Sequence, residues 1–132
     1  MIEEAIGVEV EEFYENRDGL AVVSNEEIVT NLSPSMDMIS KMDYIGLIVT
    51  SRGENVDFVS RFFAPQIGVP EDPVTGSAHC ELIPLWAKKL NKNKLTAKQL
   101  SSREGTLYCE YLNDRVIIGG EAVTVLSGEL II

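Results

Sequence analysis

The chain has 132 residues, of which 45% are hydrophobic and 24% charged, and its formal net charge is −10. This size and composition predict one globular domain, residues 1–132, with an ordinary hydrophobic core. The acidic balance argues against nucleic acid as a partner, because its binders need clustered Lys and Arg, and equally against an anionic membrane surface.

The chain's hydropathy and its cysteines indicate a reduced, cytoplasmic setting. No apolar stretch approaches the ~20 residues that cross a bilayer, and the first residues lack the basic start and apolar core of a signal peptide. Cys80 and Cys109 have no CxxC partner, and one histidine is too few for an ordinary zinc site. We therefore expect a cytoplasmic protein without a structural metal, in which both cysteines are small core residues.

The first third of the chain contains signals for two strands and two helices. Residues 8–14 and 20–23 are typical of short strands joined by a turn. Ser24, followed three residues later by Glu27, predicts a capping box at the start of a short helix. Ser33, which precedes a proline, predicts the start of a second helix.

The middle of the chain favours two adjacent strands and an ordered loop. Residues 44–50 and 56–64 are apolar, β-branched and aromatic runs, and the turn-rich segment 51–55 joins them. Residues 65–73 contain three prolines and a glycine, which predicts a loop and neither a strand nor a helix.

A long helix is predicted over residues 76–90. It is apolar nearly all round, since only Glu81, Lys88 and Lys89 carry charge. A helix of this kind is normally surrounded by other elements and is not laid on a surface. Pro84 removes a backbone hydrogen bond in its middle and is expected to bend it.

The last third of the chain is rich in strand signals. The predicted strands are 95–102, 106–112, 115–118 and 122–126, with a final apolar run at 129–132 as a further edge. Strands on both sides of one buried helix predict an α+β domain, in which a curled mixed β-sheet wraps around that helix.

The string from Glu71 to His79 (EDPVTGSAH) places an acid directly before the start of this helix. Moving a proton on carbon requires a base near the C–H bond and a donor for the charge left behind. Asp72 is the candidate base, and Ser77 is the candidate hydroxyl donor or acceptor. Free N–H groups at the helix start suit the carboxylate of a small substrate. The residues expected to bind it are Thr75, Gly76, Ser77 and Ala78.

A helix start with nothing bound explains the same residues. Asp72 or Thr75 would then cap the first turn, and Gly76 would only permit a tight backbone. His79 taken alone is more often a buried histidine with satisfied hydrogen bonds than a catalyst. The pattern by itself leaves both interpretations open.

Longer strings of the chain resemble the second half of PhzF-like (phenazine biosynthesis-like) proteins. These strings run from Arg61 to Pro65 (RFFAP) and from Glu71 to Cys80 (EDPVTGSAHC), and Trp86 follows them. Later similar residues are Gln99, Ser101, Arg103, Val116, Gly119 and the closing Val125 to Leu130. The resemblance extends from about Val8 to the end of the chain. Glu104 departs from it, because the family more often has a second glycine there in an Arg-Gly-Gly step.

The resemblance implies one half of the diaminopimelate epimerase-like fold, in which two similar halves each curl a sheet around a central helix. It also implies proton movement at carbon without a cofactor, in a cleft between the halves. Asp72 and Ser77 match positions that line the cleft, and the Gly76-Ser77-Ala78 step matches the anion-holding start of the helix. PhzF-like proteins use no thiol, so Cys80 is not expected to be a catalyst.

The family's principal acid/base is a glutamate of the N-terminal half, to which nothing here corresponds. We therefore expect an isomerase that is complete only as a homodimer, with two copies of Asp72 and Ser77 around one cleft, or as a hetero-pair with a separate N-terminal half. Paired carboxylates would give one acid and one base. A non-catalytic remnant that binds small anions and a purely structural scaffold are the alternatives.

Overall fold

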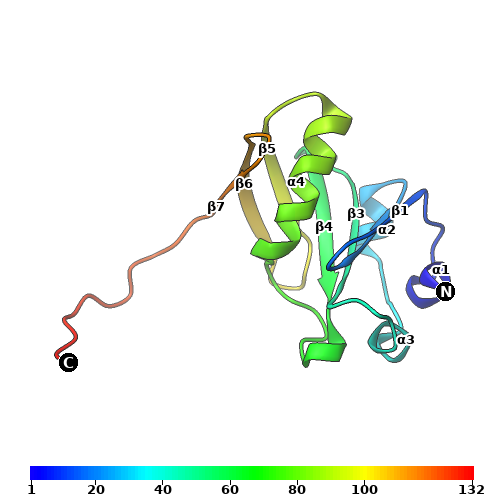
Figure 1. Ribbon diagram of the computed structural model, residues 1–132, viewed down its shortest axis with the longest axis horizontal. Helices are drawn as coiled ribbons and strands as arrows, with labels where there is room; N and C mark the ends of the chain where they lie inside the picture. The colour runs from blue at the N-terminus through cyan, green and yellow to red at the C-terminus, as the bar shows by residue number, and fades with distance from the viewer.

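The computed structural model describes residues 1–132 and contains one unclosed seven-stranded sheet, in the order β1 to β7 (Figure 1). The strands β2 and β3 are parallel, as are β4 and β5, and the other neighbours are antiparallel. The predicted α+β class with a mixed sheet is confirmed. The strands are β1 (Glu12–Glu15), β2 (Gly19–Val22), β3 (Leu47–Arg52), β4 (Phe58–Phe63), β5 (Lys94–Gln99), β6 (Gly105–Tyr111) and β7 (Val116–Gly119).

The helices occupy the connections between strands. Each parallel pair needs a crossover connection: α2 and α3 lie between β2 and β3, whereas α4 lies between β4 and β5. No helix is long and apolar enough to span a membrane. The helices are α1 (Ile2–Ile6), α2 (Glu26–Thr30), α3 (Met36–Ser40), the short 3-10 helix η1 (Pro65–Ile67) and α4 (Gly76–Leu90).

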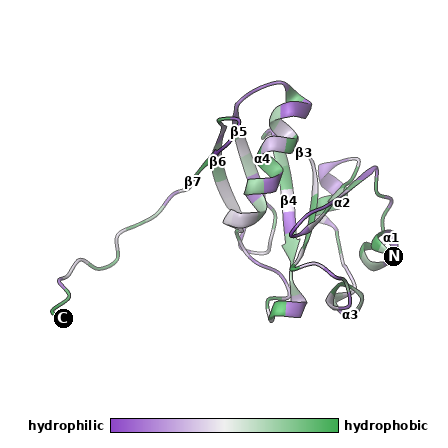
Figure 2. Cartoon of the chain, viewed as in Figure 1, coloured by the Kyte–Doolittle hydropathy of each residue, from purple (hydrophilic) through white to green (hydrophobic).

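The sheet has a hydrophobic core on each face. Ile48 of β3 packs with α4, whereas its neighbours Leu47 and Val49 pack with α1, α2 and α3. Successive side chains of a strand point to opposite faces, so a strand covered on both faces is apolar throughout. This explains why β3 begins with Leu47, Ile48 and Val49 and why β4 is apolar apart from Ser60 and Arg61. In Figure 2 both strands are largely green, and purple interrupts β4.

The helix α4 is anchored to the sheet by its aromatic side. Trp86 stacks on Phe58 with ring centroids 5.9 Å apart, and its indole N–H donates to the Thr50 hydroxyl at 3.0 Å. The opposite side is uncovered, because the sheet does not close around it (Figure 1). Cys80 lies on this side and is exposed, so its predicted place in the core is wrong, whereas Cys109 is buried as expected.

The short helices begin one or two residues later than their sequence signals suggested. Asn25, and not Ser24, caps α2 by accepting the Ile28 N–H at 3.0 Å. Ser35, and not Ser33, caps α3. Both errors have one cause, since neighbouring Ser and Asn residues are near-equal caps and only the chain path chooses between them. The helix α1 carries no capping side chain at its start and was not predicted.

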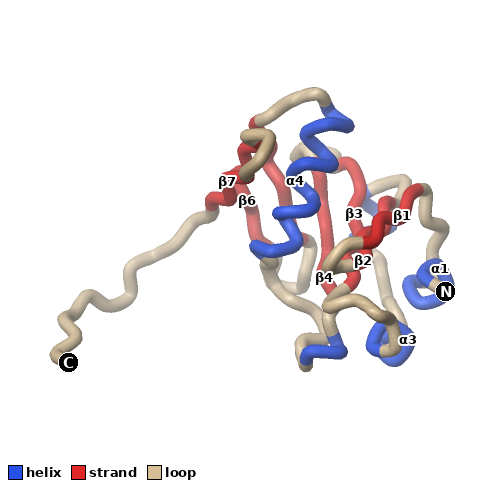
Figure 3. The backbone as a smooth tube through the Cα atoms, viewed as in Figure 1, coloured by secondary structure: helices blue, strands red, loops and turns tan.

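The end of the chain differs most from expectation. Residues 120–132, which we call the C-terminal arm, form no strand and leave the body of the molecule (Figures 1 and 3). The strands predicted at 122–126 and 129–132 are therefore absent from this structure. A strand needs a hydrogen-bonding neighbour, and the arm has none here.

Candidate functional site

The segment that leads into α4 is fixed to the sheet by an ion pair and a backbone bond. Arg61 binds Glu71 through two hydrogen bonds, at 2.7 and 3.0 Å, and also donates to the Leu32 carbonyl at 2.9 Å. The Asp72 N–H donates to the Phe62 carbonyl at 3.1 Å. Two-point binding by arginine holds a carboxylate in one orientation. The position of Asp72 is thus set by β4, on which Arg61 and Phe62 lie.

A buried network connects Asp72 to the start of α4. The Thr75 hydroxyl donates to Oδ2 of Asp72 at 2.5 Å, and the Thr75 N–H donates to Oε1 of Gln99 at 2.8 Å. The Gln99 amide in turn donates to the Asp72 carbonyl at 2.8 Å and to the Thr75 hydroxyl at 2.9 Å. Gln99 is fully buried, so its two bonds to Thr75 are shielded from water, whereas the bonds that end on Asp72 are part-buried. Sequence reasoning did not assign Gln99 a role.

Because the Thr75 hydroxyl bonds to Asp72, it does not cap α4. Thr75 is the N-cap residue by position, yet no side chain accepts a hydrogen bond from the first turn. The first N–H groups of a helix have no partner within the helix. The backbone N–H groups of Gly76, Ser77 and Ala78 are therefore the donors that the start of α4 offers, beside the positive end of the helix dipole.

Ser77 faces the turn between β1 and β2. Its hydroxyl is exposed and accepts a hydrogen bond from the Arg17 guanidinium at 3.0 Å. Arg17 also pairs with Asp18 at 3.2 Å, and one oxygen of this fully buried carboxylate has no partner. Burial and the nearby Asp18 raise the pKa of Glu81, one turn along α4. The contacts of the turn with Ser77 and Glu81 join residues about 60 positions apart, so no local sequence pattern predicted them.

His79 lies under the network. It is fully buried, and its Nδ1 donates to the Thr75 carbonyl at 2.7 Å because a carbonyl only accepts. Its Nε2 has no partner. Burial lowers the pKa of the imidazole. The expected burial of His79 is confirmed, whereas its hydrogen bonds are satisfied only at Nδ1. The ring packs beneath the start of α4 in its neutral form.

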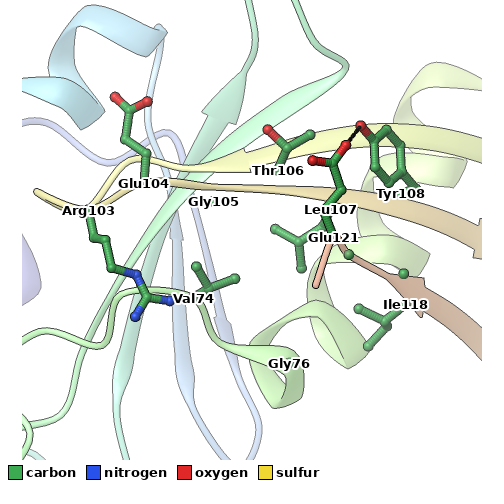
Figure 4. Close-up of a pocket in the computed structure, with 12 residues that line it drawn as sticks. Val74, Gly76, Arg103, Glu104, Gly105, Thr106, Leu107, Tyr108, Ile118 and Glu121 are labelled. Atoms are coloured by element: carbon green, nitrogen blue, oxygen red, sulfur yellow. Dashed lines mark hydrogen bonds between the residues drawn. The ribbon is translucent and has the colours of Figure 1, made fainter. Parts of the chain in front are cut away.

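A pocket of about 520 Å³ opens beside the start of α4. Figure 4 shows the Arg103 side chain reaching toward the loop that carries Val74, whereas Glu104 points away from it. The walls come from the loop before α4, from β6 and from the end of β7. They are lined by Val74, Gly76, Arg103, Glu104, Gly105, Thr106, Leu107, Tyr108, Ile118, Gly119, Gly120 and Glu121.

The loop that carries Arg103 is held against the segment before α4. The Ser101 hydroxyl donates to the Pro73 carbonyl at 2.8 Å. At Gly105 the backbone comes so near that a Cβ atom would lie 2.2 Å from Cγ2 of Val74, so a larger residue there would displace the Val74 side chain. Glu104 has a φ of 55°, in the left-handed region that favours glycine. This backbone conformation gives a physical reason for the glycine that the PhzF-like pattern more often has at this position.

The predicted site residues occupy three neighbouring places. Gly76 lines the pocket. Asp72 and Thr75 are bonded to each other and do not line the pocket, and Ser77 is turned toward Arg17. The side chain of Ala78 is buried, so only its backbone N–H is available. The structure brings together no group of three or more His, Cys, Asp or Glu side chains that could hold a metal ion.

Comparison with known proteins gives consistent matches. The profile of the phenazine biosynthesis-like protein family (PhzC-PhzF) matches residues 10–128. An uncharacterized isomerase of Pseudomonas aeruginosa is 48% identical over 130 residues, which are 98% of this chain and 50% of that protein. The chain spans about half the length of the relatives it matches.

Two solved structures are similar to this one. A phenazine biosynthesis protein of the PhzF family from Enterococcus faecalis superimposes with a TM-score of 0.89 at 47% identity, over 90% of this chain and 46% of that one. A PhzC/PhzF protein from Clostridium difficile gives a TM-score of 0.87 at 43% identity, over 98% of this chain and 51% of that one. These matches confirm the resemblance drawn from the motif.

Proposed function

The chain belongs to the phenazine biosynthesis-like protein family, and from this we propose that it is an isomerase subunit. Three relatives at 48%, 42% and 44% identity bear the name isomerase, which supports the reaction class. We propose that the reaction moves a proton on carbon of a small carboxylate-bearing substrate and needs no cofactor. A cytoplasmic location accompanies the proposal, supported by two cysteines that form no disulfide.

The observation that carries the proposal is that unpartnered helix N–H groups and a cation meet at one pocket, while Asp72, four residues before Gly76, is held by Thr75 next to the same helix start. Gly76 and Arg103 both line the pocket. The first-turn N–H groups of α4 and the Arg103 guanidinium bind the substrate carboxylate, since both favour negative charge. They also stabilise the charge that develops when the neighbouring C–H bond loses its proton.

Asp72 and Ser77 are the proposed proton carriers. The Asp72 carboxylate takes the proton from carbon and returns it elsewhere on the substrate, so the reaction is balanced without any co-reactant. Thr75 holds one carboxylate oxygen of Asp72 and leaves the other for the proton. The Ser77 hydroxyl, to which Arg17 donates, keeps its own hydrogen free to donate to the substrate.

The facing wall of the cleft comes from a second polypeptide in this proposal. The chain spans about half the length of the relatives it matches. In a homodimer, a second copy contributes its own Asp72 and Ser77, and the paired carboxylates separate into one acid and one base. In a hetero-pair, an N-terminal half takes that place.

Isotope exchange tests the proposal. The purified chain is incubated in heavy water with a panel of small amino acids and cyclic carboxylates, and proton NMR follows deuterium uptake at carbon. Asp72→Asn is expected to lower uptake at least 100-fold, which is the low end of a general base's contribution. Asp37→Asn is the matched control, because Asp37 lies in an exposed pair with Lys41. Equal uptake in both variants contradicts the proposal.

A domain that binds small anions without turning them over is the alternative. One observation favours this alternative. A single copy already provides the hydrogen-bond donors that would bind an anion, whereas the pocket is open on one side and does not enclose a substrate. Amide chemical shifts of residues 76–78 that respond to acetate, with no deuterium uptake in any substrate, would support this alternative.

A further inference from the structure

The C-terminal arm exposes a row of large apolar side chains. Glu121 accepts a hydrogen bond from the Tyr108 hydroxyl at 3.2 Å, and beyond it the arm leaves the body (Figure 1). Many large apolar side chains exposed together on one short segment point to an interaction site. The exposed fractions are 88% or more for all six side chains: Val123, Val125, Leu126, Leu130, Ile131 and Ile132.

We propose that this arm is the dimerisation element of the chain, and that its partner is a second copy. Residues 116–132 of the two copies run antiparallel around a twofold axis at Thr124, which joins the two sheets edge to edge. The inference rests on the proposed function insofar as that function needs a facing half. It identifies the facing half as a second copy of this chain, and residues 116–132 as the segment that binds that copy.

The sequence of this segment is self-complementary around Thr124. Residues at equal distances before and after Thr124 lie opposite each other, and apolar residues meet apolar residues. Such cross-strand pairs are the unit of sheet stabilisation. The pairs are Val116 with Ile132, Ile117 with Ile131, Ile118 with Leu130, Gly119 with Glu129, Gly120 with Gly128, Glu121 with Ser127, Ala122 with Leu126, Val123 with Val125, and Thr124 with itself, so each glutamate lies opposite a small residue.

Neighbouring registers lack this match. With the axis at Val125, Glu121 of one copy lies directly opposite Glu129 of the other, and like charges there are destabilising. With the axis at Val123, Glu129 lies opposite Ile117. The register at Thr124 is therefore favoured by both charge and hydropathy.

The free edge of β7 offers the matching backbone groups. The Leu112 N–H donates to the Arg115 carbonyl at 2.9 Å, which makes these two a hydrogen-bonded pair. Strand alternation then points the N–H of Ile117 toward β6 and those of Val116 and Ile118 away from it, toward the free edge. An added antiparallel strand satisfies these two groups, which an edge strand otherwise leaves to water.

The added strand also covers the uncovered side of α4. Ile118 pairs with Cys109 of β6, which belongs to the core around α4, so the even-numbered side chains of β7 face this helix. Leu130 and Ile132 of the second copy come to lie beside Ile118 and Val116 on that face. A second pocket, of about 330 Å³, lies there, and its lining includes Cys80, Pro84, Tyr111 and Val116.

A mass measurement on the unchanged chain and on a matched pair of variants tests whether the partner is a second copy. Sedimentation velocity of the 132-residue chain is expected to give twice 14.6 kDa. Leu130→Gln is expected to weaken the dimer at least tenfold, since Leu130 is opposite Ile118 in both halves of the interface. Glu129→Gln, one residue away and facing the other side, is expected to leave it unchanged. A monomeric unchanged chain, or equal effects of both variants, overturns the proposal.

Disulfide trapping tests the register. In a Cys80→Ser background, Thr124→Cys places two thiols at the axis and is expected to give a covalent dimer on oxidation. Gly128→Cys is expected to give none, because the two thiols lie about 26 Å apart at eight strand residues. No cross-link at residue 124, or equal cross-linking of both variants, overturns the proposal.

The experiments distinguish failure of the proposed dimerisation from failure of the proposed isomerase activity. A cross-linked dimer that moves no deuterium leaves the arm's role intact and contradicts the isomerase. A monomer that exchanges deuterium contradicts the arm's role and the need for a second polypeptide, and leaves the proposed reaction class intact.

Discussion

Thr75 donates its hydroxyl to Asp72 at 2.5 Å and thereby leaves the start of α4 uncapped. Capping side chains are common at this position, and their loss costs about 0.5–2 kcal/mol. Here the Thr75 hydroxyl instead donates its hydrogen bond to Asp72, the carboxylate that is proposed to move a proton. The same choice leaves the first N–H groups of the helix open to a substrate. One side chain thus couples the proposed base to the proposed anion site.

Thr75→Val is expected to lower the free energy of unfolding by about 1–3 kcal/mol. Valine keeps the shape but leaves the buried Gln99 amide and Asp72 with one hydrogen bond fewer each, and unmet buried groups carry this cost. Urea unfolding followed by the fluorescence of Trp86 measures it. Thr75→Ser keeps the hydroxyl and is expected to retain most of the stability. Equal losses in both variants would contradict the network.

Gly76→Ala separates binding from folding. A Cβ atom at Gly76 meets nothing within 4 Å, and alanine is the better helix former, so stability is expected to stay equal or to rise by up to about 1 kcal/mol. The new methyl group stands in the pocket, so acetate is expected to shift the amide signals of residues 76–78 at least threefold more weakly.

Gly68→Ala is the reverse control for that variant. Gly68 has a φ of 84°, which alanine adopts only with strain, so stability is expected to fall by about 1 kcal/mol with acetate binding unchanged. If Gly76→Ala leaves acetate binding unchanged as well, the anion site does not lie at the start of α4.

Glu104→Gly is expected to stabilise the chain by about 0.5–1 kcal/mol. The left-handed conformation at φ 55° costs a non-glycine residue about 1–3 kcal/mol, and the greater freedom of glycine in the unfolded chain offsets part of that gain. Thermal unfolding by circular dichroism measures the change. A destabilised Glu104→Gly variant would mean that the glutamate side chain contributes more than its backbone strain costs.

Much of the fold could be predicted because its central elements carry strong local signals. The strands β3 and β4 and the helix α4 are long apolar segments bounded by turn residues, and the helix bounds 76–90 agree with the structure. The exposure of Cys80 could not be predicted, because an all-apolar helix does not tell which side a sheet leaves open. The strands predicted in the C-terminal arm were wrong for a related reason. A strand-like sequence forms a strand only where a neighbouring strand is available to pair with it.

The candidate site was visible in the sequence only along one segment. Asp72, Thr75 and Gly76 are neighbours in the chain, so their closeness follows from the motif itself. Gln99 and Arg17 reach them from β5 and from the turn after β1, through contacts that depend on the folded sheet. The family resemblance includes Gln99 without giving it a role, and no sequence pattern points to Arg17, so their contacts at the site come from the structure.

His79 is expected to make stability fall as the pH drops from 7.5 to 5.5. Burial lowers its pKa in the folded chain, while the unfolded chain keeps a value of about 6.5. Below about pH 6.5 the unfolded state binds a proton that the folded state does not bind. The free energy of unfolding therefore decreases by up to about 1.4 kcal/mol for each unit by which the pH falls. Glu81 has the opposite sign, since its raised pKa favours the folded state at low pH.

Urea unfolding at several pH values isolates the histidine, because it is the only one in the chain. His79→Asn keeps a donor near the Thr75 carbonyl but does not titrate, so its stability is expected to be flat or to rise slightly over the same range. The difference between the two curves then reports His79 alone. If the unchanged chain and His79→Asn lose stability in parallel, the imidazole accepts its proton in the folded state, and its unpartnered Nε2 has access to water.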